Sequence, residues 1–174
     1  MITIIAGTNR KNSTTLKIAK FYQDKIEKQG ISTTMIDLAE LPQDFIFSAL
    51  YENNGKHLIF NQFRQKIAES TKIIFIVPEY NASYPGVLKG FIDGLSYPDA
   101  LAGKKAALVG LSAGVLGNAW GLNHLTDIFH YLQMEVLSIK VRLASVKSHF
   151  IDGEMRNDLY NDLINLQIEK FINF

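Results

Sequence analysis

The sequence predicts one α/β domain, a doubly wound parallel sheet of five strands between two layers of helices. Short apolar runs alternate along the chain with longer amphipathic stretches, which is the pattern of strands connected by helices. The runs are almost continuously hydrophobic, as expected for strands that helices cover on both faces. The 174 residues fit a single domain at roughly 150 residues per domain. We therefore expect residues 1–174 to form one three-layer α/β/α unit.

The apolar runs and the helical spacings give the expected elements in order. Strands are predicted at residues 2–6, 31–38, 72–77, 105–111 and 136–141. Helices are predicted at residues 14–29, 57–70, 85–95, 119–132 and 156–171. Residues 39–56 are expected to be irregular, with turn signals at Pro42 and at Asn53-Asn54-Gly55. Residues 42–60 match no functional pattern.

Composition excludes several classes of function. Lysine plus arginine number 18 and aspartate plus glutamate 17, so a net charge of +1 gives no reason to expect a nucleic-acid or polybasic membrane partner. The absence of cysteine excludes disulfides, thiolate metal sites and cysteine nucleophiles. The start of the chain lacks a basic segment typical of signal peptides, and no apolar run is long enough to span a membrane. We expect a cytoplasmic protein.

Ligands of doubly wound sheets bind beyond the carboxyl ends of the strands, near the point where the strand order reverses. The loops that follow the first, third and fourth strands are therefore the candidate site. We call them the first loop (residues 7–15), the second loop (residues 78–86) and the third loop (residues 111–118). Each has an unusual composition.

The first loop leads from a strand into a helix, where backbone N–H groups and the helix dipole bind anions. It is neither a Walker loop nor a G-x-G-x-x-G turn. It offers hydroxyl groups and one guanidinium that can hold a terminal monophosphate, at Thr8, Arg10, Ser13, Thr14 and Thr15. The alternative is that Ser13 or Thr14 only caps the helix and Arg10 is a surface charge.

The second loop follows the most hydrophobic strand. Pro78 stops the strand, while Tyr80 and Tyr84 offer flat amphipathic surfaces. Asn81 and the free backbone groups could bind the edge of a planar heterocycle. The alternative is a rigid turn between two prolines, with Tyr80 packed inward. Glu79 could supply a proton, but we expect it to be solvated or salt-bridged.

The third loop allows three interpretations. Gly114 and Gly117 permit close approach of a ligand to the backbone, or simply supply positive φ. The string Gly110-Leu111-Ser112-Ala113-Gly114 also satisfies G-x-S-x-G, the nucleophile elbow of serine hydrolases, and Asp127 and His149 follow in the required order. An elbow places its helix directly after the serine, however, whereas here the helix is expected to start near Asn118.

At these three loops the sequence resembles the NADPH-dependent FMN reductase family of the flavodoxin-like fold, which includes quinone, azo-dye and chromate reductases. The element order matches as well, so the resemblance covers essentially the whole domain. The matching segments are Gly7-Thr8-x-Arg10-x-x-Ser13-x-Thr15, Pro78-Glu79-Tyr80-Asn81 with Pro85-Gly86-Val87-Leu88-Lys89-Gly90-x-x-Asp93, and Ser112-x-Gly114-x-x-Gly117.

The resemblance implies a cofactor, a co-substrate and a set of roles. The phosphate of FMN is expected at Thr8, Arg10, Ser13, Thr14 and Thr15. The isoalloxazine ring is expected along Pro78, Glu79, Tyr80 and Asn81, with Ser112, Ala113, Gly114 and Gly117 at its other edge. NAD(P)H would deliver hydride in a ping-pong scheme, and a flavin, quinone, azo compound or similar small acceptor would then collect the electrons. The flavin carries the chemistry, so no protein acid, base or nucleophile is required. The family also implies a homodimer or a tetramer of dimers.

Other features of the chain bear on these expectations. A non-enzymatic electron carrier is the main alternative with flavin, but such carriers are usually strongly acidic, unlike this chain. Lys89 and Asp93 are spaced to form an ion pair on a helix surface. No metal site is expected, since His124 and His130 lie on different faces of a helix. Gly94 and Tyr97 depart from the family pattern and bear on substrate choice or subunit contacts.

Overall fold

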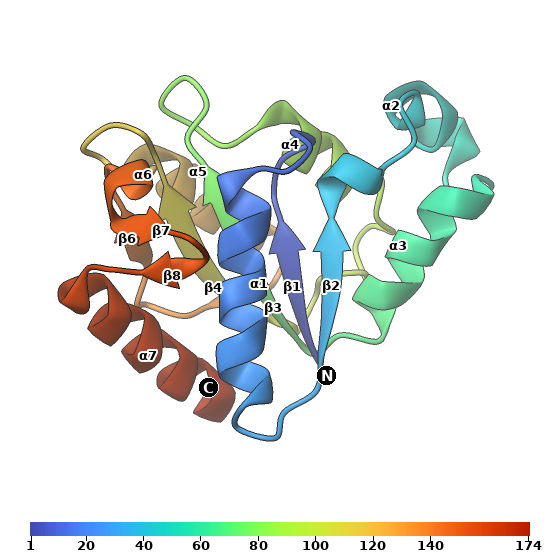
Figure 1. Cartoon of the computed structure of the whole chain (residues 1–174). Helices are drawn as coiled ribbons and strands as arrows, with labels where there is room; N and C mark the ends of the chain where they lie inside the picture. Colours follow the sequence, from blue (N-terminus) through green and yellow to red (C-terminus); the bar gives the residue numbers. More distant parts are fainter.

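A parallel sheet runs through the centre of the molecule (Figure 1). The computed structural model describes all 174 residues. The strands are β1 (Ile2–Ala6), β2 (Thr33–Asp37), β3 (Lys72–Pro78), β4 (Lys105–Leu111), β5 (Glu135–Val136) and β6 (Val141–Leu143). Their order is β2-β1-β3-β4-β5, with β6 also paired to β4, and every pair is parallel. The prediction of a doubly wound, flavodoxin-like parallel sheet is confirmed, and the strand order reverses between β1 and β3.

Helices cover both faces of the sheet, which confirms the three layers. They are α1 (Thr14–Glu27), α3 (Leu58–Ala68), α4 (Gly86–Asp93), α5 (Ala119–Tyr131) and α7 (Asp158–Asn173). Two separate buried clusters result, one beneath α1 and α7 and the other beneath α3, α4 and α5. Side chains of β3 alternate between them: Ile74 and Ile76 lie in the first cluster, and Phe75 in the second.

The fifth strand differs from the prediction of a continuous strand over residues 136–141. Its position in the sheet is shared by β5 and β6, which pair with β4 on either side of a gap. Ala106 is paired with Val136, but Val109 is paired with Val141, so the chain at residues 137–140 bulges out of register. Gln167 from α7 fills the gap: its buried amide donates hydrogen bonds to the carbonyl oxygens of Leu108 at 3.0 Å and Ile139 at 2.8 Å.

Two other segments contain short elements that the sequence patterns did not show. The stretch expected to be irregular holds three helical turns, η1 (Leu38–Glu40), α2 (Phe45–Ser48) and η2 (Tyr51–Asn53). Phe45 anchors it to the core by stacking on Phe60, with ring centroids 5.7 Å apart. Farther along, α6 (Val146–His149) precedes a hairpin of β7 (Phe150–Ile151) and β8 (Glu154–Met155). None of the helices combines the length and apolar character needed to cross a bilayer.

Replacing Gln167 with leucine should lower the free energy of unfolding by about 3 kcal/mol, measured by urea denaturation. The substitution takes the donor from two backbone carbonyls, and it also removes the acceptor of the buried Tyr22 hydroxyl, which lies 3.0 Å from Gln167 Oε1. Gln65→Leu is the matched control, because Gln65 is exposed and bonds only to Glu69. A loss for Gln167→Leu no larger than that of the control would contradict the role of this amide.

Candidate active site

The first loop presents a set of unused hydrogen-bond donors. Ser13 caps α1, and its hydroxyl oxygen accepts the N–H of Leu16 at 3.1 Å. The backbone N–H groups and the hydroxyls of Thr14 and Thr15 have no partner within the chain. The Arg10 side chain is exposed and forms no ion pair, and the first turn of α1 holds no acidic residue. The helix-cap alternative therefore describes Ser13, while the remaining groups are free to bind an anion.

The second loop is a tight turn that brings Tyr80 to the first loop. Pro78 ends β3, paired with Leu111, and the chain then reverses at Asn81 and Ala82, whose φ angles are 52° and 58°. The backbones of Tyr80 and Ser83 exchange hydrogen bonds of 2.9 and 3.0 Å across this turn. The left-handed backbone is costly for alanine, so a conformation held here carries local strain. The Tyr80 hydroxyl lies 2.7 Å from Thr8 Oγ1, so its side chain is directed at the first loop.

The third loop approaches the end of β4 closely. A Cβ on Gly110 would lie 2.2 Å from the carbonyl oxygen of Gly117, so only glycine fits at this point of the strand. Gly117 itself has a φ of 56°. The N–H groups of Ala113, Gly114 and Val115 have no partner in the chain and lie in an exposed part of the loop. They form a second group of free donors.

Ser112 does not have the environment of a nucleophile. It is 8% exposed, and its hydroxyl donates to the carbonyl oxygen of Gly114 and accepts the N–H of Gly117, each at 2.9 Å. The ring of His149 packs on Tyr160, and Asp127 lines a groove between α4 and α5. Helix α5 begins only at Ala119. Ser112 therefore closes the turn of the third loop, and the geometry does not support the hydrolase interpretation.

Asn118 joins the third loop to the second, a role that the sequence patterns did not assign. Its side-chain amide donates to the carbonyl oxygens of Val77 at 3.0 Å and Pro78 at 3.2 Å. Its backbone N–H donates to Glu79 Oε2 at 3.0 Å. Glu79 is half-buried and forms no ion pair, and one of its carboxylate oxygens accepts this backbone N–H, so the salt-bridged form of the expectation is not found. The signal in the sequence was an asparagine directly before a helix, since asparagine tolerates the φ of 63° found here.

Residues 143–146 support the third loop through backbone hydrogen bonds, a role that the sequence patterns did not indicate. The N–H of Ser112 donates to the carbonyl oxygen of Leu143, and the N–H of Val146 donates to that of Ser112. The N–H of Ser145 donates to the carbonyl oxygen of Gly114 at 2.7 Å, and Ser145 has a φ of 45°. The turn between β6 and α6 therefore holds the third loop in place.

These contacts place the first, second and third loops together at the carboxyl edge of the sheet. The Thr8–Tyr80 bond connects the first loop to the second, and the bonds of Asn118 to Glu79 and Pro78 connect the third loop to the second. The first loop keeps a cation, hydroxyls and N–H groups free, as a phosphate monoester requires, and the third loop keeps N–H groups free for a polar ring edge. This donor set fits FMN, and the class defined by fold and site is that of a doubly wound domain that binds a mononucleotide.

Comparison with known proteins identifies the class more closely. Residues 1–146 match the family model described as NADPH-dependent FMN reductase. A quinone reductase of Pseudomonas putida is 27% identical over 98% of this chain and 91% of that protein. An NAD(P)H-dependent FMN reductase of Pseudomonas aeruginosa is 32% identical over 80% of this chain and 76% of that protein. The chain belongs to the NADPH-dependent FMN reductase family. It is an oxidoreductase with FMN as cofactor and NAD(P)H as electron donor.

A solved structure agrees with this fold. The flavoenzyme NAD(P)H:(acceptor) oxidoreductase FerB from Paracoccus denitrificans superposes with a TM-score of 0.79. The alignment covers 99% of this chain and 94% of that chain at 23% identity, a likeness that concerns the fold alone.

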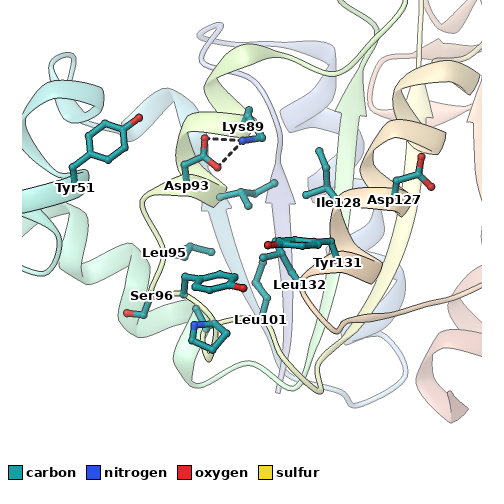
Figure 2. A pocket seen from close by; sticks show the side chains of 14 residues that line it. Tyr51, Lys89, Asp93, Leu95, Ser96, Leu101, Asp127, Ile128, Tyr131 and Leu132 are labelled. Atoms are coloured by element: carbon teal, nitrogen blue, oxygen red, sulfur yellow. Dashed lines mark hydrogen bonds and ion pairs between the residues drawn. The ribbon is translucent and has the colours of Figure 1, made fainter.

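A separate groove lies between α4 and α5, and none of its lining residues belongs to the three loops (Figure 2). Its volume is about 670 Å³, and its floor is apolar, with Leu95, Leu101 and Leu132 among the lining residues. Lys89 and Asp93 form the predicted ion pair at its rim, with an N–O distance of 2.7 Å. The exposed rings of Tyr97 and Tyr131 stack with centroids 6.5 Å apart, and the neighbouring Tyr131 side chain raises the pKa of Tyr97.

Two substitutions at Asn118 separate its side-chain bonds from its backbone conformation. Asn118→Gly keeps the positive φ but removes the amide donor, and should cost about 1–2 kcal/mol of unfolding free energy. Asn118→Ala should be less stable than Asn118→Gly by about 1 kcal/mol, because alanine is strained at this φ. Urea unfolding of the two variants checks this order. Equal stability of the alanine and wild-type proteins would contradict both contributions.

Proposed function

We propose that this enzyme takes hydride from NAD(P)H and passes the electrons to a small acceptor by a ping-pong scheme at the three loops. The acceptor is of the quinone, azo or free-flavin type. The observation that supports this most strongly is the cluster of unpaired donors at the first loop, with Arg10 free of any carboxylate. Several relatives are named quinone reductases, which supports an acceptor of the quinone type. Because the reaction draws on NAD(P)H, we also propose a cytoplasmic location.

The residues of the first loop would hold the phosphate of FMN. Arg10 can form paired hydrogen bonds to phosphate oxygens, and the N–H groups of Thr14 and Thr15 add the positive end of the α1 dipole. Further hydroxyl groups for the phosphate would come from Thr8, Ser13, Thr14 and Thr15, and those of Thr14 and Thr15 are free of other partners. When bound, FMN supplies the hydride and electron chemistry that these side chains lack.

The second and third loops would bind the ring. The backbone of Pro78, Glu79, Tyr80 and Asn81 would run along one side of the ring. The Asn81 side chain is exposed and free to bind a polar edge. Ser112 shapes the third loop, so that the N–H groups of Ala113 and Gly114 remain available, with Gly117 allowing the close turn. These donors would stabilise negative charge on the reduced ring, as an oxyanion hole does. No protein acid or base is required for this scheme.

Arg10→Ala should weaken FMN binding at least about tenfold, because it removes charge-assisted hydrogen bonds to the phosphate. Flavin fluorescence titration measures the affinity. Lys20→Ala is the matched control, since Lys20 is an exposed cation on α1 without a partner.

Initial rates of NAD(P)H oxidation by the FMN-loaded wild type, with a soluble benzoquinone varied, should give parallel reciprocal plots. Absence of NAD(P)H oxidation would favour an electron carrier, and intersecting plots would contradict the ping-pong scheme.

We propose further that the groove between α4 and α5 is the interface of a homodimer. Three exposed aromatic side chains border this groove: Tyr51 is 79% exposed, Tyr97 70% and Tyr131 73%. Exposed aromatic rings around an apolar floor are typical of surfaces that associate. The stacked pair of Tyr97 and Tyr131 gives the face a rigid aromatic element that a second copy of the chain could cover. A tetramer would arise from two such dimers.

Tyr131→Glu should convert the dimer to a monomer at micromolar concentration, because it places a charge at the border of the apolar groove, where the second copy would bury it. Sedimentation velocity measures the change. The control is Leu159→Glu, which introduces the same charge at an exposed apolar residue of α7. A monomeric wild type, or a Tyr131→Glu variant that stays dimeric, would contradict the proposed interface.

A further inference from the structure

The hydrogen bond between Thr8 and Tyr80 connects the two ends of the proposed flavin site. Thr8 belongs to the first loop and is 1% exposed, whereas Tyr80 belongs to the second loop, beside the proposed ring site. Their oxygen atoms lie 2.7 Å apart, which is the usual length of a good O–H to O hydrogen bond. It is the one side-chain hydrogen bond between these loops in the structure.

Either oxygen can donate in this bond, so its direction depends on the other groups around the two hydroxyls. A threonine hydroxyl has one hydrogen and two lone pairs. Thr8 Oγ1 also lies 3.4 Å from the backbone N of Arg10, which can only donate. The Tyr80 hydroxyl has no other partner in the chain. If Tyr80 and the Arg10 N–H both donate to Thr8, the hydrogen of Thr8 is left for an acceptor outside the chain.

A phosphate monoester at the first loop would settle this direction. Phosphate oxygens are negatively charged and only accept, so the Thr8 hydrogen would turn to phosphate and the Tyr80 hydrogen to Thr8. Hydrogen bonds arranged in such a chain polarise and strengthen one another. The Tyr80 hydroxyl would thus act on the phosphate without touching it.

The backbone of Tyr80 is well placed for this role. It lies between the end of β3 and the turn at Asn81 and Ala82, and it exchanges two hydrogen bonds with Ser83. The neighbouring Glu79 is held by the N–H of Asn118. The hydroxyl is therefore presented to Thr8 by a braced loop, which lowers the entropy lost when the phosphate binds.

We propose that Tyr80 is a positioning residue that selects phosphorylated flavin: it orients the Thr8 hydroxyl toward the phosphate and so favours FMN over riboflavin. This inference rests on the proposed function of the three loops and assigns Tyr80 to the phosphate end of the site. The backbone of the second loop would still face the ring. Because the link is reciprocal, occupation of the first loop by phosphate also stabilises the position of the second loop.

Affinities for FMN and riboflavin in a double-mutant cycle test the proposal. The proteins are the wild type, Tyr80→Phe, Thr8→Val and the double variant, with flavin fluorescence as the readout. Tyr80→Phe should lower the affinity for FMN about five- to tenfold. This is the value of one hydrogen bond in a series of hydrogen bonds that ends on a charged group. Riboflavin affinity should change less than twofold. In the Thr8→Val background, Tyr80→Phe should have no further effect on FMN, and Thr8→Ser should retain the preference for FMN.

The matched control is Tyr84→Phe, which removes a hydroxyl without a hydrogen-bond partner from the same loop and should leave both affinities unchanged. Equal losses for FMN and riboflavin in Tyr80→Phe would overturn the proposal, because they would show a contact of Tyr80 with the ring. Tighter FMN binding would also overturn it, since the hydroxyl would then compete with the phosphate.

A second measurement separates this proposal from the proposed function. Inorganic phosphate should raise the melting temperature of the wild type, and the rise should be smaller in Tyr80→Phe and smallest in Thr8→Val. If the wild type binds neither flavin but shows this pattern with phosphate, the flavin assignment fails, and the proposed orientation of the Thr8 hydroxyl by Tyr80 stands. If FMN binds well and phosphate raises the melting temperature equally in all variants, the proposed role of Tyr80 fails and the proposed function stands.

Discussion

The structure depends on one constraint at the carboxyl ends of its central strands: three irregular loops must be held firmly while most of their N–H groups stay unused. The usual way to hold a loop is to pair its backbone groups, which would consume the donors that a ligand needs. Here side chains share this work with a small number of backbone bonds, several of which use the carbonyl groups of the third loop and spare its N–H groups. The Asn118 amide supports the end of β3, and Thr8 and Tyr80 join the first loop to the second. The donors of Thr14, Thr15 and the third loop remain free.

Charge and backbone conformation reinforce this arrangement. The net charge of the chain is only +1, but the first loop and the first turn of α1 contain no carboxylate to neutralise Arg10. The first loop itself therefore carries a net positive charge, from Arg10 and Lys11, even though the molecule is nearly neutral. Left-handed residues occur in all three loops, at Asn12, Asn81, Ala82 and Asn118 among others. Such conformations cost free energy and gather where a site must be preorganised.

The string G-x-S-x-G shows why a motif needs its structural context. In a serine hydrolase the serine is exposed on a sharp turn into a helix. Here Ser112 is buried, both its donor and its acceptor capacity are used within the third loop, and two further glycines intervene before α5. The same residues that suggest a nucleophile thus form a turn that leaves the neighbouring N–H groups exposed. The family membership of the chain agrees with a turn that exposes N–H groups and not with a nucleophile elbow.

The sequence by itself determined the layered architecture, because continuous apolar strands can be buried only between helices, and the alternation of periods is a local property. It also located the three loops, since glycine, proline and hydroxyl residues after a strand act through their own backbone and side chains. Only the tertiary structure decided three features. These are the gap in the fifth strand that Gln167 fills, the support of the third loop by residues 143–146, and the hydrogen bonds from the Asn118 amide to the end of β3. Each joins segments that lie far apart in the chain, and a contact of that kind depends on where the whole fold places two backbones, which no local pattern of residues encodes.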